Sequence, residues 1–304
     1  MHQLPEQFTR TIVDLHEDAG VEWLNQLPQI IAECERRWSI SVLPPFANLS
    51  YNYVAPAMTA DGREVVLKLG VPNLELTREI TALRYYDGRG IVQLLDSDPE
   101  KGILLQERLH PDTLLSSLAD DEQATSIAAA VMRRLWRPAP PEHPFPTVAD
   151  WAGSLRKLRA QFAGETGPLP AQLVDAAEGL FAELIDSMAE PVLLHGDLHH
   201  DNIMAAEREP WLALDPKGVI GEPAYEVGAL LRNPIAQIAS MPNLRGILAR
   251  RVDQLAEELE LDRDRLIGWG FAQAVLSAWW SIEDHNSGWQ QSIVCAEQLY
   301  ALLR

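Results

Sequence analysis

One short stretch of the chain gathers side chains that can carry out chemistry. It reads HGDLHHDN over residues 195–202, and an Asp-Pro-Lys-Gly segment begins at Asp215. A carboxylate such as Asp197 can orient a hydroxyl group and accept its proton. The amide oxygen of Asn202 and the carboxylate of Asp215 would be suitable ligands for a hard cation such as Mg²⁺. A base, metal ligands and a cation for the donor phosphates are the parts that phosphoryl transfer from a nucleotide requires.

Two short apolar segments would position these groups. Val192–Leu194 and Trp211–Leu214 both read as strands; the first ends at the HGDLHHDN stretch and the second ends at Asp215. The layout Asp-x4-Asn, then strand, then Asp is typical of a kinase catalytic loop followed by its metal-binding segment. Asp and Asn often only cap turns, but a complete run between two strands favours the chemical interpretation.

A candidate for the cation on the donor phosphates is Lys68, which ends the apolar run Val65-Val66-Leu67. A lone Lys in such a run needs water or a polar partner. Glu79, on the helix expected to follow, is the predicted counter-ion, and Glu75, one turn earlier, is a weaker rival. A Lys that grips phosphates and is steadied by a helix Glu is the kinase arrangement. The alternative is a strand-edge Lys that discourages aggregation.

The first part of the chain predicts a mixed α+β unit. Helical periodicity covers residues 6–37, where Gly20 and Pro28 favour two shorter helices over one. An antiparallel sheet should follow, with a tight turn at Asp61-Gly62. The expected elements are strands at Asn48–Ala57 and Arg63–Leu69, a helix at Leu74–Tyr86, and a hairpin of Ile91–Asp96 and Ile103–Glu107.

The rest of the chain is mainly helical. Because strands give way to helices near residue 108, we expect two domains: 1–107, an N-terminal lobe with leading helices, and 108–304, a helical C-terminal lobe with the 195–202 loop. The predicted helices are Thr113–Leu118, Glu122–Trp136, Val148–Phe162, Ala171–Met188, Ala224–Leu231, Asn243–Glu258, Arg263–Glu283 and Ser287–Leu303.

Composition narrows the class of protein. The 304 residues are 47% hydrophobic and 23% charged, which is ordinary for a globular protein, and no apolar run is long enough to span a bilayer. The N-terminus lacks an apolar signal core, and the two cysteines lie far apart, so we expect a cytoplasmic protein without disulfides. A net charge of −19 disfavours nucleic acid and anionic membranes and favours cationic partners.

Several longer stretches resemble a known family. HGDLHHDNIM followed by LALDPKGVIGEPAYEVGALLRNP is similar to the aminoglycoside and hydroxyurea phosphotransferases, in particular to their streptomycin 6-phosphotransferase branch. REITALRYYDGRGIVQLL and FAQAVLSAWWSIED also resemble that branch, so the similarity runs from about Phe46 to the C-terminus. The resemblance implies a protein-kinase-like fold with two lobes, ATP bound between the lobes, and Mg²⁺.

The resemblance also assigns roles. It implies that Asp197 is the catalytic base, that Asn202 and Asp215 are metal ligands, and that Lys68 contacts phosphates with Glu79 as its partner. His195 would support the loop. The nucleotide would further meet Ser50, in a phosphate-covering loop without glycine, and main-chain groups of Glu107 and Leu109 where sheet gives way to helix.

The acceptor implied by the resemblance is a small cation that carries guanidinium groups. Carboxylates and aromatic faces recognise such groups. The candidates are Trp280, Glu283 and Asp284, late in a helix, and Glu222, just after the Asp215 segment. The tryptophan could instead pack in the core, and the acids could simply be solvated.

Other functions stay open at this level. Hydroxyurea, a sugar or an amino-alcohol would be alternative acceptors. His195, Asp197, His199, His200 and Asp201 crowd together and could instead belong to a metallohydrolase. A third reading is a nucleotide-binding module without catalysis, although every catalytic residue type is present. The pattern distinguishes neither ATP from GTP nor one oligomeric state from another.

Overall fold

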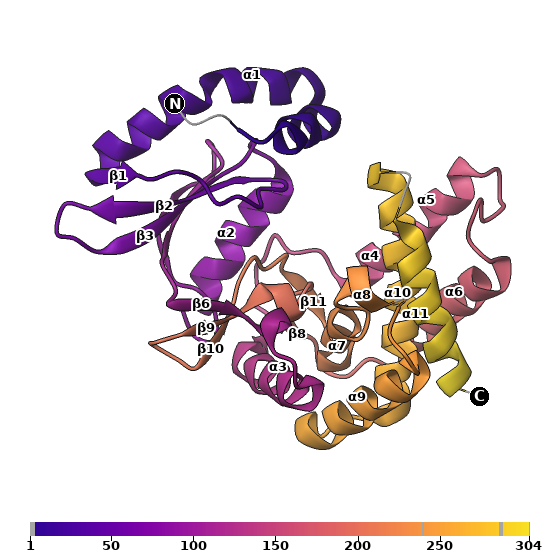
Figure 1. The fold of residues 1–304 in the computed structure, drawn as a ribbon. Coiled ribbons are helices and arrows are strands. Elements are labelled where there is room, and N and C mark those ends of the chain that lie inside the picture. Colours follow the sequence, from indigo (N-terminus) through magenta and orange to yellow (C-terminus); the bar gives the residue numbers. More distant parts are fainter. Residues whose placement is uncertain (1–3, 239, 286–287, 304) are drawn as a thin grey trace. The chain divides into compact units, whose positions relative to one another are not determined.

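The chain forms two compact units, residues 1–110 and 111–304 (Figure 1). The structure is a computed structural model that describes residues 4–238, 240–285 and 288–303. The first unit is built on an antiparallel sheet and the second is mainly helical, so the fold class is the predicted one. The boundary lies just after the one expected from the sequence at residue 107.

The sheet of the first unit has five strands in the order β1-β2-β3-β5-β4, and all neighbours are antiparallel. The predicted turn joins β2 to β3, and Gly62 adopts a φ of 83° there, which a residue without Cβ adopts at no steric cost. The strands are β1 (Ile40–Val42), β2 (Tyr53–Thr59), β3 (Glu64–Leu69), β4 (Leu94–Asp98) and β5 (Ile103–Glu107).

Two helices cover opposite faces of this sheet (Figure 1). Leu67 and Leu69 of β3 pack in one apolar cluster with buried residues of α1 (Glu6–Trp38). Side chains alternate along a strand, so Lys68 points to the other face, where α2 (Leu74–Tyr86) lies. This explains why all of Leu67–Leu69 is buried although one of its side chains is charged.

The leading helical segment is interrupted, as predicted, but at a different residue. Its backbone leaves helical geometry at Glu17, with φ 51° and ψ −129°, whereas Pro28 is accommodated inside the helix. Gly20 has another role: a Cβ there would lie 2.5 Å from the carbonyl oxygen of Ile12. The glycine therefore permits the close approach of the two helical pieces instead of marking the break itself.

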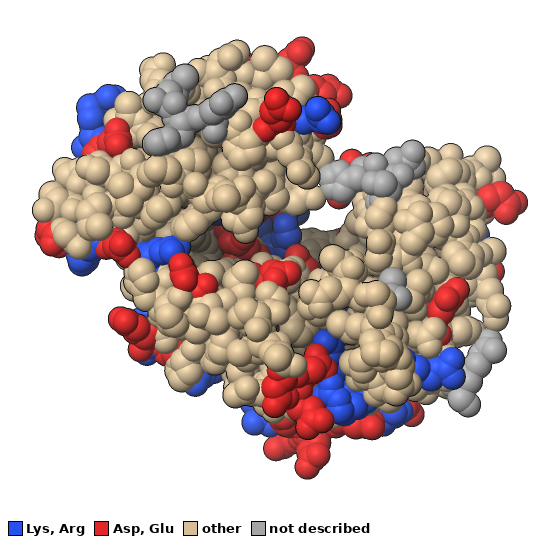
Figure 2. Space-filling view, viewed as in Figure 1, with Lys and Arg blue, Asp and Glu red and all other residues tan. Residues whose placement is uncertain are grey.

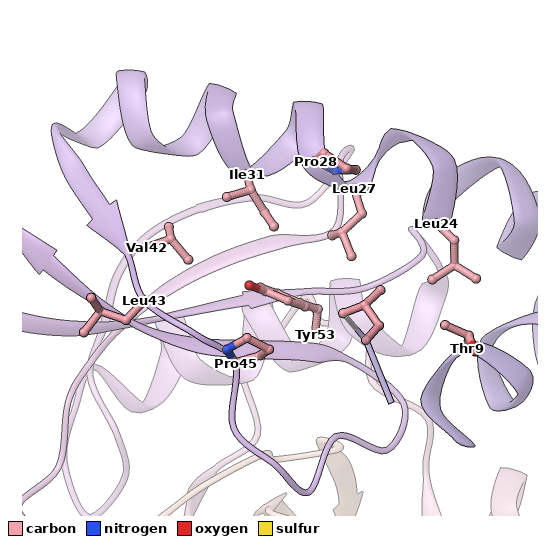
Figure 3. Close-up of a pocket in the computed structure, with 10 residues that line it drawn as sticks. Thr9, Leu24, Leu27, Pro28, Ile31, Val42, Leu43, Pro45 and Tyr53 are labelled. Carbon is pink, nitrogen blue, oxygen red and sulfur yellow. The ribbon is translucent and has the colours of Figure 1, made fainter. Parts of the chain in front are cut away.

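A cavity of about 420 Å³ lies between α1 and the sheet (Figure 3). Its lining is largely apolar, and Leu27 and Ile31 reach it from the helix while Val42 and Tyr53 reach it from the strands. Because Tyr53 is in the same cluster as Leu67 and Leu69, the cavity is on the face of the sheet opposite to Lys68.

The second unit is organised around one long helix, α10, which packs against α6, α7, α9 and α11. Two three-stranded sheets, β10-β9-β6 and β11-β8-β7, carry the segments that surround the 195–202 loop. The helices are α3 (Asp121–Leu135), α4 (Val148–Ala152), α5 (Ser154–Gln161), α6 (Ala171–Asp186), α7 (Pro223–Leu231), α8 (Ile235–Ile238), α9 (Leu244–Leu259), α10 (Arg263–His285) and α11 (Trp289–Leu302). The strands are β6 (Pro111–Leu114), β7 (Arg137–Pro138), β8 (Val192–Leu194), β9 (Ile203–Ala206), β10 (Trp211–Ala213) and β11 (Val219–Gly221).

Two predicted helices of this unit are wrong in detail. The expected helix Thr113–Leu118 is instead the end of β6, which pairs with β9, followed by a short 3-10 turn. The expected helix Val148–Phe162 is divided into α4 and α5 at Gly153, a residue with low helix propensity. The predicted start of the last helix, Ser287, lies outside the described residues.

The surface carries charges of both signs. On the face shown in Figure 2, Lys and Arg side chains are interspersed among the more numerous Asp and Glu side chains. In the described part of the chain, no helix combines the length and the apolar character needed to cross a bilayer.

Candidate active site

His195 links the two segments that carry the predicted catalytic groups. It follows β8 directly and is fully buried. Its Nε2 donates to the carbonyl oxygen of Leu214 at 2.6 Å, and its Nδ1 accepts from the backbone N–H of Asp197 at 3.2 Å. Burial lowers the pKa of His195 to about 4, so the ring is neutral and has the one donor and one acceptor that these bonds use.

Asn202 completes the connection between the loop and the Asp215 segment. Its Nδ2 donates to the main-chain carbonyl oxygen of Asp197 at 2.9 Å. The main-chain carbonyl oxygen of Asn202 accepts from the N–H of Leu214 at 2.9 Å. With Nδ2 committed to the loop, Oδ1 is the side-chain atom left to act as a ligand. Asp215 follows β10 with an exposed side chain. An amide oxygen and a carboxylate are the oxygen donors that Mg²⁺ takes, so this pair fits that ion.

The Asp197 carboxylate lies between Arg232 and His199. Oδ1 lies 3.1 Å from Nη2 of Arg232, and Oδ2 lies 3.6 Å from Nε2 of His199. Burial alone would raise the pKa of Asp197, but His199, Arg232 and Lys217 outweigh burial and hold the pKa well below its usual range. The side chain is 27% exposed. Asp197 is therefore an ionised carboxylate that an approaching hydroxyl group can reach.

Glu226, on α7, fixes the backbone just before Asp197. Its two oxygens accept the N–H groups of His195 and Gly196 at 2.7 and 2.9 Å. Burial raises the pKa of Glu226 to about 7, although both hydrogen bonds favour the ionised form. Glu226 is not among the residues predicted from the sequence. The available signal was an acid between Tyr225 and Val227 within an apolar helix, because buried acids occur almost only with partners.

Lys68 and Glu79 form the predicted ion pair in the first unit. The Lys68 Nζ lies 2.7 Å from Oε1 of Glu79, and the two side chains are 5% and 9% exposed. The rival acid Glu75 is exposed at the start of α2. The pairing is confirmed; contact of Lys68 with phosphate stays a prediction.

The other predicted nucleotide-binding residues also lie in the first unit. Ser50 is exposed in the glycine-free connection between β1 and β2. Glu107 ends β5, and its carboxylate accepts from the N–H of Gln93 at 2.8 Å. The side chain of Leu109 is buried. Because the side chains of Glu107 and Leu109 are engaged or buried, only main-chain groups could bind a nucleotide there, and that contact stays a prediction.

One predicted acceptor-binding residue is contradicted. Glu222 is buried, and its carboxylate accepts hydrogen bonds from the Arg265 guanidinium at 2.7 and 3.0 Å, from the Trp269 indole and from the N–H of Ala189 at 3.2 Å. An acid that already holds an internal guanidinium has no room for a second one. Glu222 therefore joins α6, α7 and α10 and is not an acceptor ligand.

The remaining acceptor candidates lie at the end of α10. Trp279 is fully buried, whereas its neighbour Trp280 is only partly buried, because successive side chains of a helix point about 100° apart. Glu283 is exposed, and its Oε1 lies 3.3 Å from Nζ of Lys157. Asp284, the next residue, is also exposed.

The histidines of the loop do not form a metal site. His195 uses both ring nitrogens for main-chain bonds, and the side chain of His200 is buried. Across residues 4–238, 240–285 and 288–303, no group of three or more His, Cys, Asp or Glu side chains is arranged to hold a metal ion. The metallohydrolase alternative therefore cannot use His195 as a metal ligand.

Curated relatives cover nearly the whole chain. A streptomycin 6-kinase of Streptomyces glaucescens is 33% identical over 298 residues, which is 97% of this chain and 96% of the relative. A hydroxyurea phosphotransferase of Kitasatospora aureofaciens is 35% identical over 93% of this chain and 81% of its own length.

Solved structures show the fold. The choline kinase LicA of Streptococcus pneumoniae aligns with a TM-score of 0.65 at 14% identity, covering 91% of this chain and 99% of the other. An aminoglycoside phosphotransferase, APH(4)-Ia, in complex with ADP and hygromycin B, aligns with a TM-score of 0.63 at 15% identity, covering 90% and 97%. Both likenesses establish the protein-kinase-like fold expected from the sequence.

The family itself is matched over residues 37–285, which include the Lys68–Glu79 pair, the 195–202 loop and Asp215. Together with the relatives above, this match shows that the chain belongs to the aminoglycoside/hydroxyurea antibiotic resistance kinase family.

Proposed function

We propose that this protein is an ATP-dependent kinase that transfers the γ-phosphoryl group to a hydroxyl group of a streptomycin-like aminoglycoside. The observation that carries the proposal is the Asp197 carboxylate. It is ionised, partly exposed and locked in a loop that His195 and Asn202 tie to the Asp215 segment. Phosphoryl transfer needs positioning and charge stabilisation more than covalent chemistry, and such a rigid loop supplies positioning.

Each residue has a defined task in this proposal. Asp197 accepts a hydrogen bond from the acceptor hydroxyl, orients its oxygen toward the γ-phosphorus and takes the proton as the new P–O bond forms and the bond to the ADP oxygen breaks. Asn202 and Asp215 would hold Mg²⁺, which neutralises phosphate charge when it is bound. Lys68, steadied by Glu79, grips the donor phosphates. Main-chain groups near Ser50, Glu107 and Leu109 contribute to nucleotide binding.

The streptomycin-like acceptor is supported by the relatives. Streptomycin 6-kinases of two Streptomyces species are 33% and 34% identical, with 96% and 87% of their own lengths covered. A second candidate is a small neutral hydroxyl compound, because the hydroxyurea phosphotransferase is 35% identical. Both candidates use the same base and the same donor, and they differ only in the acceptor.

A substrate panel tests the proposal. Purified protein with ATP and Mg²⁺ would be offered streptomycin, other aminoglycosides, hydroxyurea and simple sugars, and ATP consumption would be measured with product mass. We expect a product of streptomycin heavier by one phosphoryl group. ATP consumption with hydroxyurea alone would select the second candidate, and no phosphorylated product at all would contradict the kinase function.

Variants of the loop identify the base. Asp197→Asn should lower kcat by about 10³-fold or more while ATP binding, measured by calorimetry, is retained. The matched control is Asp201→Asn, an exposed acid in the same loop, which should keep kcat within about two-fold. Wild-type rates for the Asp197 variant would remove Asp197 from the proposed role.

A further inference from the structure

Two indole rings form a corner next to the catalytic loop. Trp151 lies on α4 and Trp280 on α10, and their ring centroids are 5.4 Å apart with an interplanar angle of 88°. Both rings are only partly buried. In such an arrangement one ring presents its face where the other presents its edge. We call this pair the Trp151–Trp280 corner.

The corner touches the residue that precedes the base. A Cβ built on Gly196 would lie 2.8 Å from Cη2 of Trp151, so the indole is in direct contact with the backbone beside Asp197. Gly196 also has a φ of 86°, which favours glycine for a second reason. The Trp151–Trp280 corner therefore adjoins the backbone that carries Asp197.

Trp151 is held firmly in this position. α4 begins with a capping box in which Thr147 and Asp150 satisfy each other's backbone N–H groups. The residues before α4 bond to β11, since the N–H of Ile220 donates to the carbonyl oxygen of Pro146 at 2.8 Å. On its inner side Trp151 also packs against the buried Tyr225, with ring centroids 6.1 Å apart.

A carboxylate lies one helical turn beyond Trp280. Glu283 is three residues further along α10, so it projects from a nearby part of the helix surface. Its carboxylate already has a cation near it, the Lys157 ammonium at 3.3 Å, with that Lys 66% exposed. An exposed pair of this kind contributes little stability and is readily exchanged for another cation.

We infer that the Trp151–Trp280 corner is a subsite for a planar guanidinium cation of the acceptor, with Glu283 as its counter-ion. This inference rests on the proposed function, because it takes the acceptor hydroxyl to be at Asp197. A guanidinium is flat, weakly hydrated and able to stack on an indole face while its N–H edge meets a carboxylate. A compact, strongly hydrated ammonium would gain less from the same surface. The subsite therefore selects guanidinium-bearing acceptors over amine-bearing or neutral ones.

Trp280 is the residue to change first, because Trp151 also packs against the backbone at Gly196 and its loss could disturb the loop. With streptomycin as the varied substrate, Trp280→Leu should raise KM about ten-fold and leave kcat within about two-fold. Trp280→Phe keeps an aromatic face and should raise KM less. The matched control is Trp38→Leu. Trp38 is another partly buried indole, at the end of α1 in the first unit, and its loss should leave KM unchanged.

A competition experiment tests the cation class directly. Methylguanidinium should inhibit streptomycin phosphorylation competitively and more strongly than methylammonium at equal ionic strength, and Trp280→Leu should abolish the difference. An unchanged KM in Trp280→Leu, or equal inhibition by the two cations, would overturn the subsite while leaving the kinase function intact. Failure of the wild-type protein to phosphorylate streptomycin would instead overturn the proposed acceptor, and the subsite with it.

Discussion

Arg232 holds the Asp197 carboxylate through a contact of 3.1 Å between Nη2 and Oδ1. Arg232 follows the last turn of α7 and is almost completely buried, and its other terminal nitrogen donates to Gln273 of α10. The guanidinium leaves Oδ2 as the oxygen that faces His199. The Asp197 carboxylate is therefore oriented by a residue that comes 35 positions later in the chain.

Arg232→Met should make phosphorylation sensitive to acid. Loss of the guanidinium leaves burial, which raises the pKa of Asp197, less opposed. Protonation would then begin at a higher pH, so the acidic limb of the kcat/KM profile should move to higher pH. We expect a loss of about 10- to 100-fold near pH 7 and a larger loss at pH 5 than at pH 8.

The control for this profile is Arg245→Met, an exposed arginine on α9. It should reproduce the wild-type pH profile. A uniform loss of activity in Arg232→Met, equal at every pH, would assign Arg232 to folding or packing instead of to the base.

The Lys68–Glu79 pair should matter for both stability and nucleotide binding. Lys68→Met removes the cation that faces the buried Glu79 carboxylate and should lower the free energy of unfolding by about 3 kcal/mol, measured with urea. The exposed pair Lys101–Glu33 is the matched comparison, and Lys101→Met should leave the urea midpoint close to that of the wild type. Lys68→Met should also raise KM for ATP.

A double variant separates the two roles of that pair. Lys68→Met with Glu79→Leu removes both charges and should recover much of the lost stability, because no buried charge is left unpaired. The KM for ATP should stay high. If it returned to the wild-type value, Lys68 would have only a structural role.

Glu226 should give the catalytic loop a pH-dependent stability. Its folded-state pKa, about 7, lies above its ordinary value, so the folded protein binds a proton more tightly than the unfolded chain does. This contribution is fully present at pH values below the ordinary pKa and is lost as pH rises to about 7. Glu226→Gln should therefore abolish this component, so that the Tm difference between wild type and variant shrinks or inverts from pH 5 to pH 7.5.

The same variant should also affect turnover. A Gln amide offers one acceptor oxygen and one donor group, so the N–H of either His195 or Gly196 would lose its partner. We expect kcat to fall about ten-fold or more with KM for ATP little changed. A Tm difference that is flat across this pH range would show that Glu226 does not titrate there.

Asp215→Asn should weaken the dependence on Mg²⁺ without unfolding the protein. An amide is a poorer ligand than a carboxylate, so the Mg²⁺ concentration for half-maximal rate should rise about ten-fold. The side chain is exposed and the main-chain bond between Leu214 and Asn202 does not involve it, so Tm should stay close to that of the wild type. An unaltered Mg²⁺ titration would exclude Asp215 as a ligand.

Local sequence patterns were sufficient where a residue and its positioning element are close along the chain. The helix Leu74–Tyr86 was predicted with the bounds that it has in the structure, and the Lys68–Glu79 pair spans only 11 positions. Asn202 contacts the main chain of Asp197, five positions earlier. These features depend on strand alternation, helical periodicity and the chemistry of individual side chains, all of which the sequence displays directly.

The tertiary structure decided which charged and aromatic groups meet across long separations. Glu222 looked like a ligand for a guanidinium of the acceptor, but the guanidinium that it binds is that of Arg265, 43 positions later. The contacts of Glu226 and Arg232 with the loop were not predicted, because their partners lie 31 and 35 positions earlier in the chain. Trp280 and its neighbour Trp279 differ in burial because their side chains point in different directions from the helix. Sequence alone determined which chemical groups are present near the loop. Packing determined which of these groups are satisfied inside the protein and which stay exposed, because a buried charge must find its counter-charge wherever the fold brings one.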